Sequence, residues 1–194
     1  MIKTVMEPNI NELRETKRKE INKTKDVILN KPYTIITSRF NNATYNENRV
    51  FIEKKKRIAC VYCAPTLISH KVMLDSTLFV LEMNNDKNRI MGIGKVKNHP
   101  QLRKYSVYNN QNYNRYVFTG KCRIDRIDMN MEEEQIMRAF DILCFKGPYH
   151  MKRGHGLLSF PSVLLYRITP IIDLVQFICN MFNRRNLLST EQEI

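Results

Sequence analysis

Two cysteines separated by two residues form the first pattern in the sequence with chemical potential. Cys60 and Cys63 have the spacing with which two thiolates bind one zinc ion. A structural site needs two more ligands, and the sequence offers no second cysteine pair of this kind and no His-x-x-x-His pair. Because both cysteines lie in an apolar, strand-like run, we interpret them as buried thiols and expect no metal and no cofactor. Zinc is the alternative, with the remaining ligands supplied through folding by Cys122, Cys144, His70 or His99.

Two glycines in the run Ile90–Val96 invite comparison with a nucleotide-binding loop. Gly92 and Gly94 lack the third glycine of that motif, and Lys95 and Val96 continue a strand where a helix would begin. Glycines in such a strand serve tight coiling or the close approach of another group to the backbone. We therefore expect no dinucleotide site here.

No local arrangement of residues supports catalysis. Ser–His–Asp, Cys–His and paired-carboxylate patterns have no local motif in this sequence. His150 and His155 are the most site-like histidines, because they stand in the basic, glycine-containing loop Lys146–His155. A histidine in such a loop fits a phosphate contact better than a general base, so we predict that the protein is not an enzyme.

Positive charge interleaved with aromatic rings is the strongest functional signal. The chain has a net charge of +13 and a pI near 9.6, and such an excess favours binding to polyanions. Between Lys97 and Arg126 only Asp125 is acidic, while seven residues are basic and five are aromatic. Basic side chains neutralise phosphates, and aromatic faces stack on unpaired bases.

These residue types predict a non-catalytic nucleic-acid-binding protein, with single-stranded RNA or DNA as its partner. The phosphate contacts that we predict are Arg103, Lys104, Arg115, Arg123, Lys152 and Arg153, and the stacking residues are Tyr33, Tyr105, Tyr113 and Tyr149. The competing interpretation is a solvated strand whose aromatic residues face the core. Tyr116 and Phe118 share one strand face, so we expect at least one of them to be buried.

A β-hairpin is the element that organises the rest of the chain. Two apolar runs, Leu78–Leu81 and Ile90–Val96, flank the turn-forming cluster Asn84–Asn88. Further strands are predicted at Tyr33–Ser38, at Ile58–Ala64, over Arg115–Ile127 with a bulge at Gly120, and once or twice within Leu157–Arg167. Loops are expected at Phe40–Asn48 and Lys146–His155, and an exposed basic edge or turn at Glu53–Arg57.

Helices are predicted at both ends and in the middle of the chain. A polar helix over Asn9–Asn30, with an ion pair between Glu15 and Lys19, forms a loosely docked arm. Asp128–Phe145 is the best helix, with three glutamates in its first turn. The last helix is expected to run from Thr169 to Arg185, either docked on the domain or forming a protein interface.

The hairpin also resembles a known family. Its polar turn and its second strand, which reads IxGIGxV, are similar to the PUA-like β-barrel superfamily, particularly the EVE, ASCH and YTH branches. Strand Tyr33–Ser38 would be the opening strand of that family. The resemblance implies a small mixed barrel, closed or nearly so, that binds RNA or modified bases. An aromatic cage for a modified base usually includes tryptophan, which this chain lacks, so the cage residues would come from Tyr33, Phe40, Phe79 and Tyr149.

Composition completes the expectations. The chain reads as an α+β protein with a basic N-terminal arm (1–31), a PUA-like barrel (32–168) and an apolar C-terminal helix and tail (169–194). Five cysteines, no apolar leader and no apolar run of about 20 residues predict an intracellular protein without a membrane segment. Its abundant asparagine is typical of AT-rich genomes such as those of many large DNA viruses. A viral structural or assembly protein, with Thr169–Arg185 as its interface, is therefore the alternative function.

Overall fold

The computed structural model describes residues 10–12, 14–16, 18–19, 32–148 and 150–187 of the 194-residue chain. The fold is α+β, as predicted. Its strands are β1 (Tyr33–Phe40), β2 (Cys60–Ala64), β3 (Thr77–Asn84), β4 (Arg89–Lys97), β5 (Gln101–Leu102), β6 (Tyr116–Gly120), β7 (Cys122–Asp125) and β8 (Leu157–Ser159). Its helices are α2 (Asn42–Glu53), α3 (Met131–Phe145), α4 (Ser162–Ile168) and α5 (Leu174–Arg184), with short 3-10 turns η1 (Gln111–Asn114) and η2 (Arg126–Asp128).

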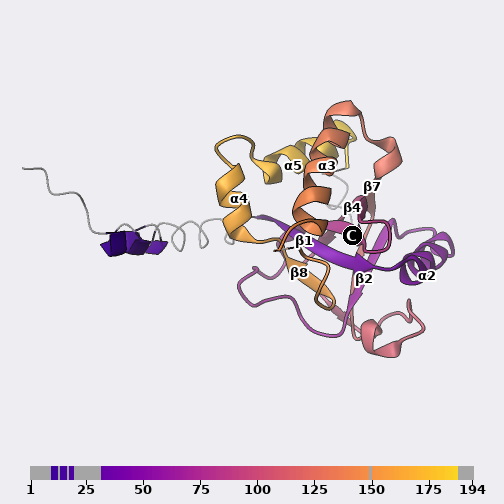
Figure 1. Ribbon diagram of the computed structural model, residues 1–194. Helices are drawn as coiled ribbons and strands as arrows, with labels where there is room; N and C mark the ends of the chain where they lie inside the picture. The colour runs from indigo at the N-terminus through magenta and orange to yellow at the C-terminus, as the bar shows by residue number, and fades with distance from the viewer. Residues whose placement is uncertain (1–9, 13, 17, 20–31, 149, 188–194) are drawn as a thin grey trace, which may run out of the picture.

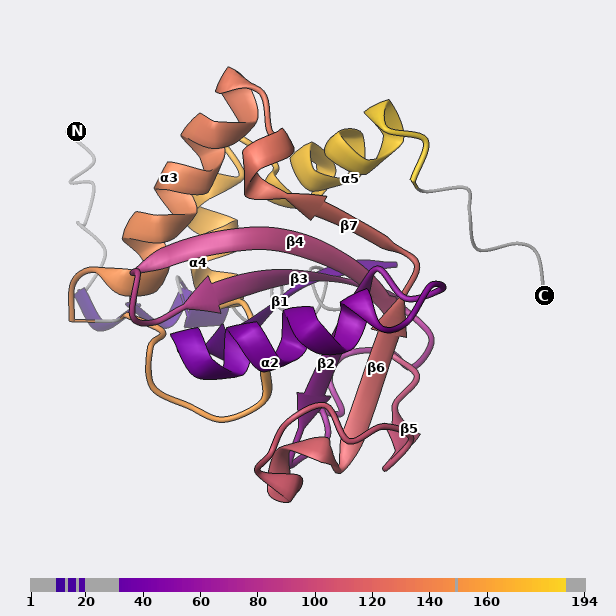
Figure 2. The same cartoon turned by 90° about the vertical axis from the view of Figure 1, so that its right-hand side faces the viewer.

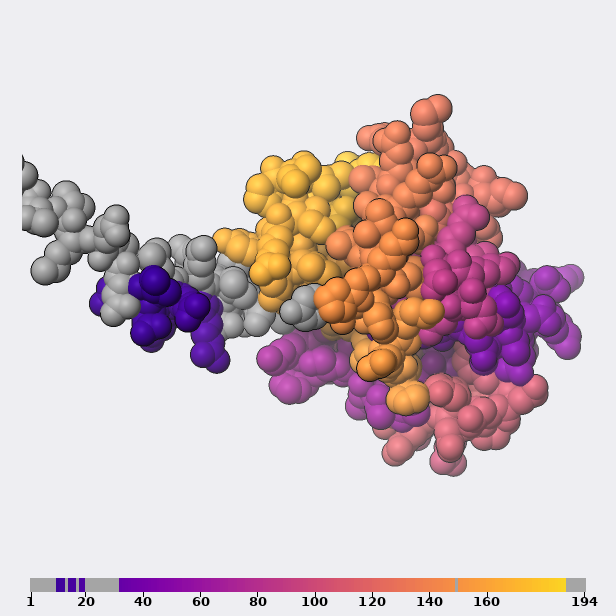
Figure 3. Space-filling view, in the orientation of Figure 1, coloured from indigo at the N-terminus to yellow at the C-terminus, as the bar shows by residue number. Residues whose placement is uncertain are grey.

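The elements form three layers, and the middle layer is a central sheet. This sheet has five strands in the order β7-β4-β3-β1-β8, and a second sheet has three in the order β2-β6-β5. Helices α3, α4 and α5 cover one face of the five-stranded sheet, while α2 and the three-stranded sheet lie on the other (Figure 1; Figure 2). In the space-filling view the segment around β5 and η1 (rose) lies at the end of the molecule opposite α5 (yellow; Figure 3).

The predicted hairpin is confirmed. Strands β3 and β4 pair antiparallel, from Thr77 opposite Lys97 to Asn84 opposite Arg89, with one irregularity between Leu81 and Met83. The Asn84 side chain accepts hydrogen bonds from the backbone N–H groups of Asp86 and Lys87, which is the local bonding that makes asparagine favourable in turns. Strand β1 is also confirmed, and it pairs parallel to β3 along its whole length.

Strand alternation divides the apolar residues between two cores. Ile35, Phe79 and Leu81 face the helices, whereas Ile36, Leu78 and Val80 face the three-stranded sheet. Phe118 of β6 is buried in the second core, as expected for at least one of the two aromatic residues of that strand. Both faces of the central sheet are thus covered by other elements. For that reason its strands are nearly continuous apolar runs in the sequence.

Three sequence predictions need correction, and a fourth, one or two strands within Leu157–Arg167, is confirmed for one strand. The segment 42–53 is a helix instead of the loop predicted from its asparagines, because Asn41 and Thr44 form a capping box. The single strand predicted over 115–127 is two strands, β6 and β7, in different sheets. Only one strand, β8, lies within Leu157–Arg167, and α4 follows it. The last helix begins at Leu174, where Asp173 accepts hydrogen bonds from the N–H groups of Val175 and Gln176.

Ion pairs join helix α3 to the end of helix α5. Helix α3 begins with the predicted acidic turn and is capped by Asn130. Its Glu133 is completely buried and accepts two hydrogen bonds from Arg185 and one from Arg184 at the end of α5. Helix α5 places Ile178, Met181 and Phe182 in the core. Its apolar face is therefore covered by the protein itself.

Neither sheet is closed, so the strand pairing does not confirm the predicted PUA-like barrel. The two sheets nevertheless approach closely, since a Cβ atom on Gly120 of β6 would lie 2.0 Å from the carbonyl oxygen of Lys95 on β4.

The described part of the predicted N-terminal arm is helical, at residues 10–12, 14–16 and 18–19. The Glu15 carboxylate lies 3.6 Å from Lys19 Nζ, and the rest of the arm lies outside the described residues. Within the described residues, no helix has the length and apolar character needed to cross a membrane.

A buried carboxylate joins the central sheet to the layer beneath it. Glu82 of β3 is completely buried and forms two hydrogen bonds with Arg123 of β7, at 2.9 and 2.7 Å. The Tyr62 hydroxyl on β2 donates to the same carboxylate at 2.8 Å, and Arg49 of α2 lies at 3.3 Å. Gly94 is required beneath this cluster, because a Cβ atom there would lie 2.0 Å from the Tyr62 hydroxyl oxygen.

Replacing Glu82 is expected to destabilise the fold strongly. The change Glu82→Gln removes the negative charge while leaving the Arg123 guanidinium buried, and losing one partner of a buried pair costs about 3–5 kcal/mol. Glu132→Gln is the matched control, because Glu132 is exposed and lies 3.9 Å from Arg184, so that it contributes less than about 1 kcal/mol. Urea denaturation of both variants measures the difference. Equal free energies of unfolding would contradict the role assigned to Glu82.

Acid is expected to unfold the protein by protonating the arginine-paired carboxylates. Burial alone would raise the pKa of Glu82, but Arg123 and Arg49 outweigh it and hold that pKa below its ordinary value. Hydrogen bonds from Arg126 lower the pKa of Glu134 to about 2. Because these folded-state pKa values lie below the unfolded ones, their stabilisation is present above about pH 4.5 and is lost progressively toward about pH 2. A urea midpoint that did not move over this range would exclude this mechanism, and Glu82→Gln should flatten the dependence.

Candidate functional site

A cavity of about 510 Å³ opens where the parallel strands β1 and β3 end. Ser38–Asn41 and the start of α2 form one wall, Asn85 follows β3, and Cys63 comes from β2. The loops 108–113 and 154–156 complete the rim. Ligands commonly bind at the carboxyl ends of parallel strands, and the volume lies in the range of small-molecule sites. This cavity is the candidate site.

Two buried polar atoms of the lining residues lack hydrogen-bond partners among the described residues. One is Nη1 of Arg39, whose Nε donates to the carbonyl oxygen of Met151 at 2.5 Å. The other is Oδ1 of Asn85, whose Nδ2 donates to the carbonyl oxygen of Lys152 at 3.1 Å. Burial lowers the pKa of Arg39. Both atoms are themselves buried, so two residues that line the cavity carry one donor and one acceptor whose hydrogen-bonding capacity is unused.

Tyrosine rings form the part of the lining that adjoins α2. Tyr108 and Tyr113 meet edge to face with ring centroids 6.5 Å apart. Tyr108 is held by Asn48, whose Nδ2 lies 3.1 Å from its hydroxyl, and burial raises the pKa of Tyr108 well above its ordinary value. Tyr113 is half-buried, and its hydroxyl lies 3.4 Å from Nδ1 of His155. This part of the lining is thus neutral, aromatic and fixed by hydrogen bonds.

The loop of His155 owes its path to glycine on both sides. Gly154 and Gly156 have φ angles of 122° and 67°, a region that other residues rarely adopt. A Cβ atom on Gly156 would also lie 2.9 Å from that of Ala64 in β2. These glycines bring His155 to the rim of the cavity beside Tyr113.

Of the site residues predicted from the sequence, the structure brings few to the cavity. Tyr113 lines it, and Lys152 and Arg153 immediately precede the rim loop 154–156. Lys152 is half-buried and its Nζ donates to Asn88 at 2.8 Å, whereas Arg153 is exposed. Tyr149 lies outside the described residues.

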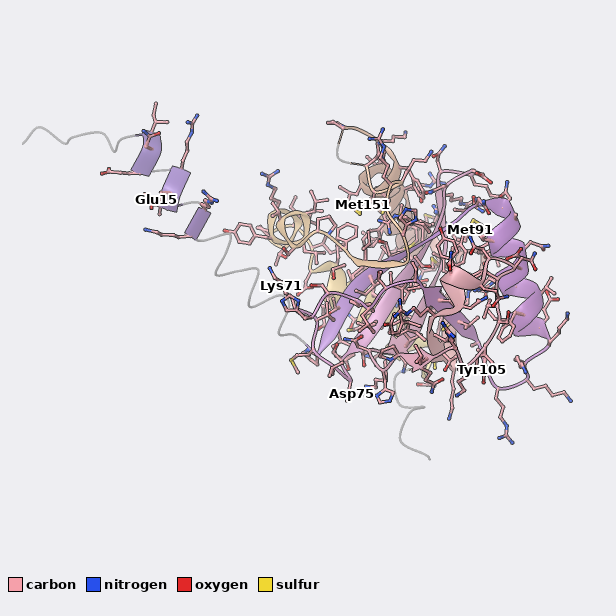
Figure 4. The ribbon with its side chains drawn as sticks, turned by 90° about the horizontal axis from the view of Figure 1, so that it is seen from below. Glu15, Lys71, Asp75, Met91, Tyr105 and Met151 are labelled. Carbon is pink, nitrogen blue, oxygen red and sulfur yellow. The ribbon has the colours of Figure 1, made fainter. Side chains whose placement is uncertain are left out.

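Three predicted phosphate contacts gather at a second, smaller hollow. This hollow has a volume of about 320 Å³, and Arg103 and Tyr105 line it together with Gln111 and Asn112. Lys104 and Arg115 are exposed beside it. Tyr105 lies at the periphery of the molecule (Figure 4). The second hollow and the cavity both draw on the 3-10 turn η1, to which Gln111, Asn112 and Tyr113 belong.

Two predicted site residues are engaged with other side chains instead, Arg123 in ion pairs and the half-buried Tyr33 in packing against the core. Arg123 is bound to Glu82 and to Asp125, with 2.6 Å between its Nη1 and the Asp125 carboxylate, so its guanidinium is already engaged. Tyr33 stacks on Phe79 with ring centroids 5.5 Å apart and planes 5° from parallel. We assign both residues a structural role. Phe79 is buried, and of the residues expected to form an aromatic cage Phe40 is one that lines the cavity.

Arg39, Asn85 and Tyr108 are not among the site residues predicted from the sequence. Arg39 follows the predicted strand Tyr33–Ser38, Asn85 lies in the predicted turn, and Tyr108 lies in the basic-aromatic segment, and only the fold brings the three together. A weak signal existed in Asn85, because an asparagine that follows a buried strand is well placed for a carboxyl-end site.

The cysteine pair is part of the β2 strand. Cys60 and Cys63 are buried, as are Cys122, Cys144 and Cys179. Burial raises the pKa of Cys60 and of Cys63 to about 12. Among the described residues, no group of three or more histidine, cysteine or acidic side chains is placed to hold a metal ion.

Comparisons with protein-family models, with curated proteins and with solved structures find no match to this chain.

The thiol of Cys63 is expected to be unreactive although it borders the cavity. With a pKa of about 12, its thiolate fraction at neutral pH is roughly a thousandfold below that of an ordinary cysteine. Iodoacetamide labelling followed by peptide mass spectrometry should therefore modify Cys63 at least about a hundredfold faster in the urea-unfolded chain than in the native protein. Comparable rates in the two states would show that the thiol is ionised or open to solvent.

Proposed function

We propose that this protein binds single-stranded nucleic acid without catalysis and holds one unpaired base in the cavity at the end of β1. The observation that carries the proposal is the pair of unused polar atoms, Arg39 Nη1 and Asn85 Oδ1, on residues that line one aromatic-walled cavity. A nucleobase edge presents donors and acceptors side by side, and a splayed base offers a flat face to tyrosine.

Selectivity in such a site comes from the cost of leaving polar groups unpaired. The Arg39 donor and the Asn85 acceptor are already buried without partners, and an apolar ligand would leave them so, whereas a base whose edge reaches them gains two hydrogen bonds. The net charge of +13 adds a sequence-independent attraction to phosphates. RNA is the favoured strand, with a modified base as one form of the ligand, because the sequence resembles PUA-like domains.

Removing the Tyr113 ring is expected to weaken binding. Stacking of one base on an aromatic ring contributes about 1–3 kcal/mol, so Tyr113→Ala should raise the Kd for single-stranded RNA by roughly five- to 150-fold. The probe is a fluorescein-labelled RNA of mixed sequence, followed by anisotropy across a salt series, with DNA of the same sequence as a second arm. Binding should weaken as salt increases.

The control is Tyr166→Ala, because Tyr166 is exposed on α4 and lines neither the cavity nor the second hollow. Its Kd should equal that of the unaltered protein. The proposal fails if no strand binds at low salt, if binding is independent of salt, or if the two tyrosine variants behave alike.

A further inference from the structure

The turn that follows α2 carries four consecutive cations. Lys54, Lys55, Lys56 and Arg57 are all exposed, and the sequence alone indicated only a basic turn. Backbone hydrogen bonds fix its shape, from the Lys55 N–H to the Ile52 carbonyl at 2.8 Å and from the Ile58 N–H to the Lys55 carbonyl at 3.2 Å. The charges are therefore presented on an ordered turn.

Aromatic rings connect this turn to the segment before β6. Phe51 of α2 and Tyr105 have ring centroids 5.3 Å apart. The Lys55 ammonium lies over both rings, 5.8 Å from the Phe51 centroid and 5.5 Å from that of Tyr105. Lys104 lies 5.4 Å from the Tyr105 centroid. These contacts place the basic turn directly beside Lys104.

Two arginines extend the same surface. The Arg103 N–H donates to the Arg115 carbonyl at 2.9 Å, which holds the two residues side by side across the β5–β6 pair. Arg103 adopts a left-handed φ of 46°. Its side chain lines the second hollow with Tyr105, and Arg115 covers the ring of Tyr116 at 5.3 Å. Seven cations thus form one continuous group.

None of these seven cations makes an ion pair with a carboxylate among the described residues. Other basic residues of the fold do, including Arg49, Arg123 and Arg126. Like charges gathered without counter-charges repel one another, and a bound polyanion relieves that repulsion. The group is therefore a site of uncompensated positive charge, which a bound polyanion would neutralise.

We infer that Lys54–Arg57, Arg103, Lys104 and Arg115, with Phe51 and Tyr105, form a basic platform that binds the phosphate backbone of the nucleic-acid strand. This inference rests on the proposed function, since the strand is the one whose base enters the cavity. The platform and the cavity are joined by η1, because Tyr113 lines the cavity while Gln111 and Asn112 line the second hollow. A flexible strand can follow that hollow, whereas a flat lipid surface cannot.

Charge removal from the turn tests the platform. The platform variant carries Lys54→Gln, Lys55→Gln, Lys56→Gln and Arg57→Gln. The control variant carries Lys71→Gln, Arg138→Gln, Lys146→Gln and Arg167→Gln, four exposed residues that lose the same charge elsewhere. Lys71 lies well apart from Tyr105 (Figure 4). Both use the full-length protein and the labelled RNA described above.

Each lost phosphate contact reduces the slope of log K against log salt by about 0.7 for a single strand. The platform variant should therefore show a slope shallower by about 2 to 3 and an affinity at least tenfold lower at low salt. The control should change affinity less than about threefold and keep its slope. Equal slopes in the two variants overturn the platform. Thermal unfolding verifies that both fold, and Lys56→Gln with Arg57→Gln is the smaller variant if the fourfold change unfolds the protein.

An abasic strand separates the platform from the cavity. A single strand of deoxyribose phosphates without bases has phosphates for the platform and no base for the cavity. The unaltered protein should bind it, the platform variant should lose that binding at least tenfold, and Tyr113→Ala should retain it. Platform-dependent binding of the RNA with no effect of Tyr113→Ala defeats the proposed base site and leaves the platform standing. Tighter binding to vesicles of phosphatidylserine and phosphatidylcholine than to either strand overturns the inference.

Discussion

The carboxylate of Glu82 is the point on which the layers of this protein depend. It sits on β3 at the centre of the main sheet, and its partners come from β7, from β2 and from α2. One buried charge is thereby shared among partners from its own sheet, from the second sheet and from a helix. Buried charges stabilise a fold only through such complete pairing. The position of α2, and hence the wall of the cavity, follows from this arrangement.

Local patterns were enough to predict the elements whose stability is local. The hairpin β3–β4, strand β1 and helix α3 were predicted because turn chemistry, β-branched residues and an acidic first turn act within a few positions. Helix α2 was not, because its asparagines suggested a loop while its stability comes from one cap and from contacts with both sheets. The division of 115–127 into β6 and β7 could not be predicted either, since the close approach of Gly120 to Lys95 is a tertiary event.

The candidate site was less predictable than the fold. Residue type identified Tyr113 and the basic residues near β5, but it could not sort arginines by environment. Arg115 and Arg123 look alike in the sequence, yet the first is exposed and the second neutralises Glu82. The cavity is assembled from segments that are far apart in the chain. The unpaired state of Arg39 Nη1 and Asn85 Oδ1 depends on these tertiary contacts, so it could not be predicted from the sequence.

The pairing of β1 with β8 has a consequence for how the site comes into being. The Thr37 hydroxyl donates to the carbonyl of Leu158, a residue 121 positions later, and the rim glycines Gly154 and Gly156 precede that strand. Contacts at such sequence separation form late and slow folding. A ribosome must therefore have made the chain as far as residues 154–156 before the rim can be complete, and a product that ends before Gly154 lacks this part of the cavity lining.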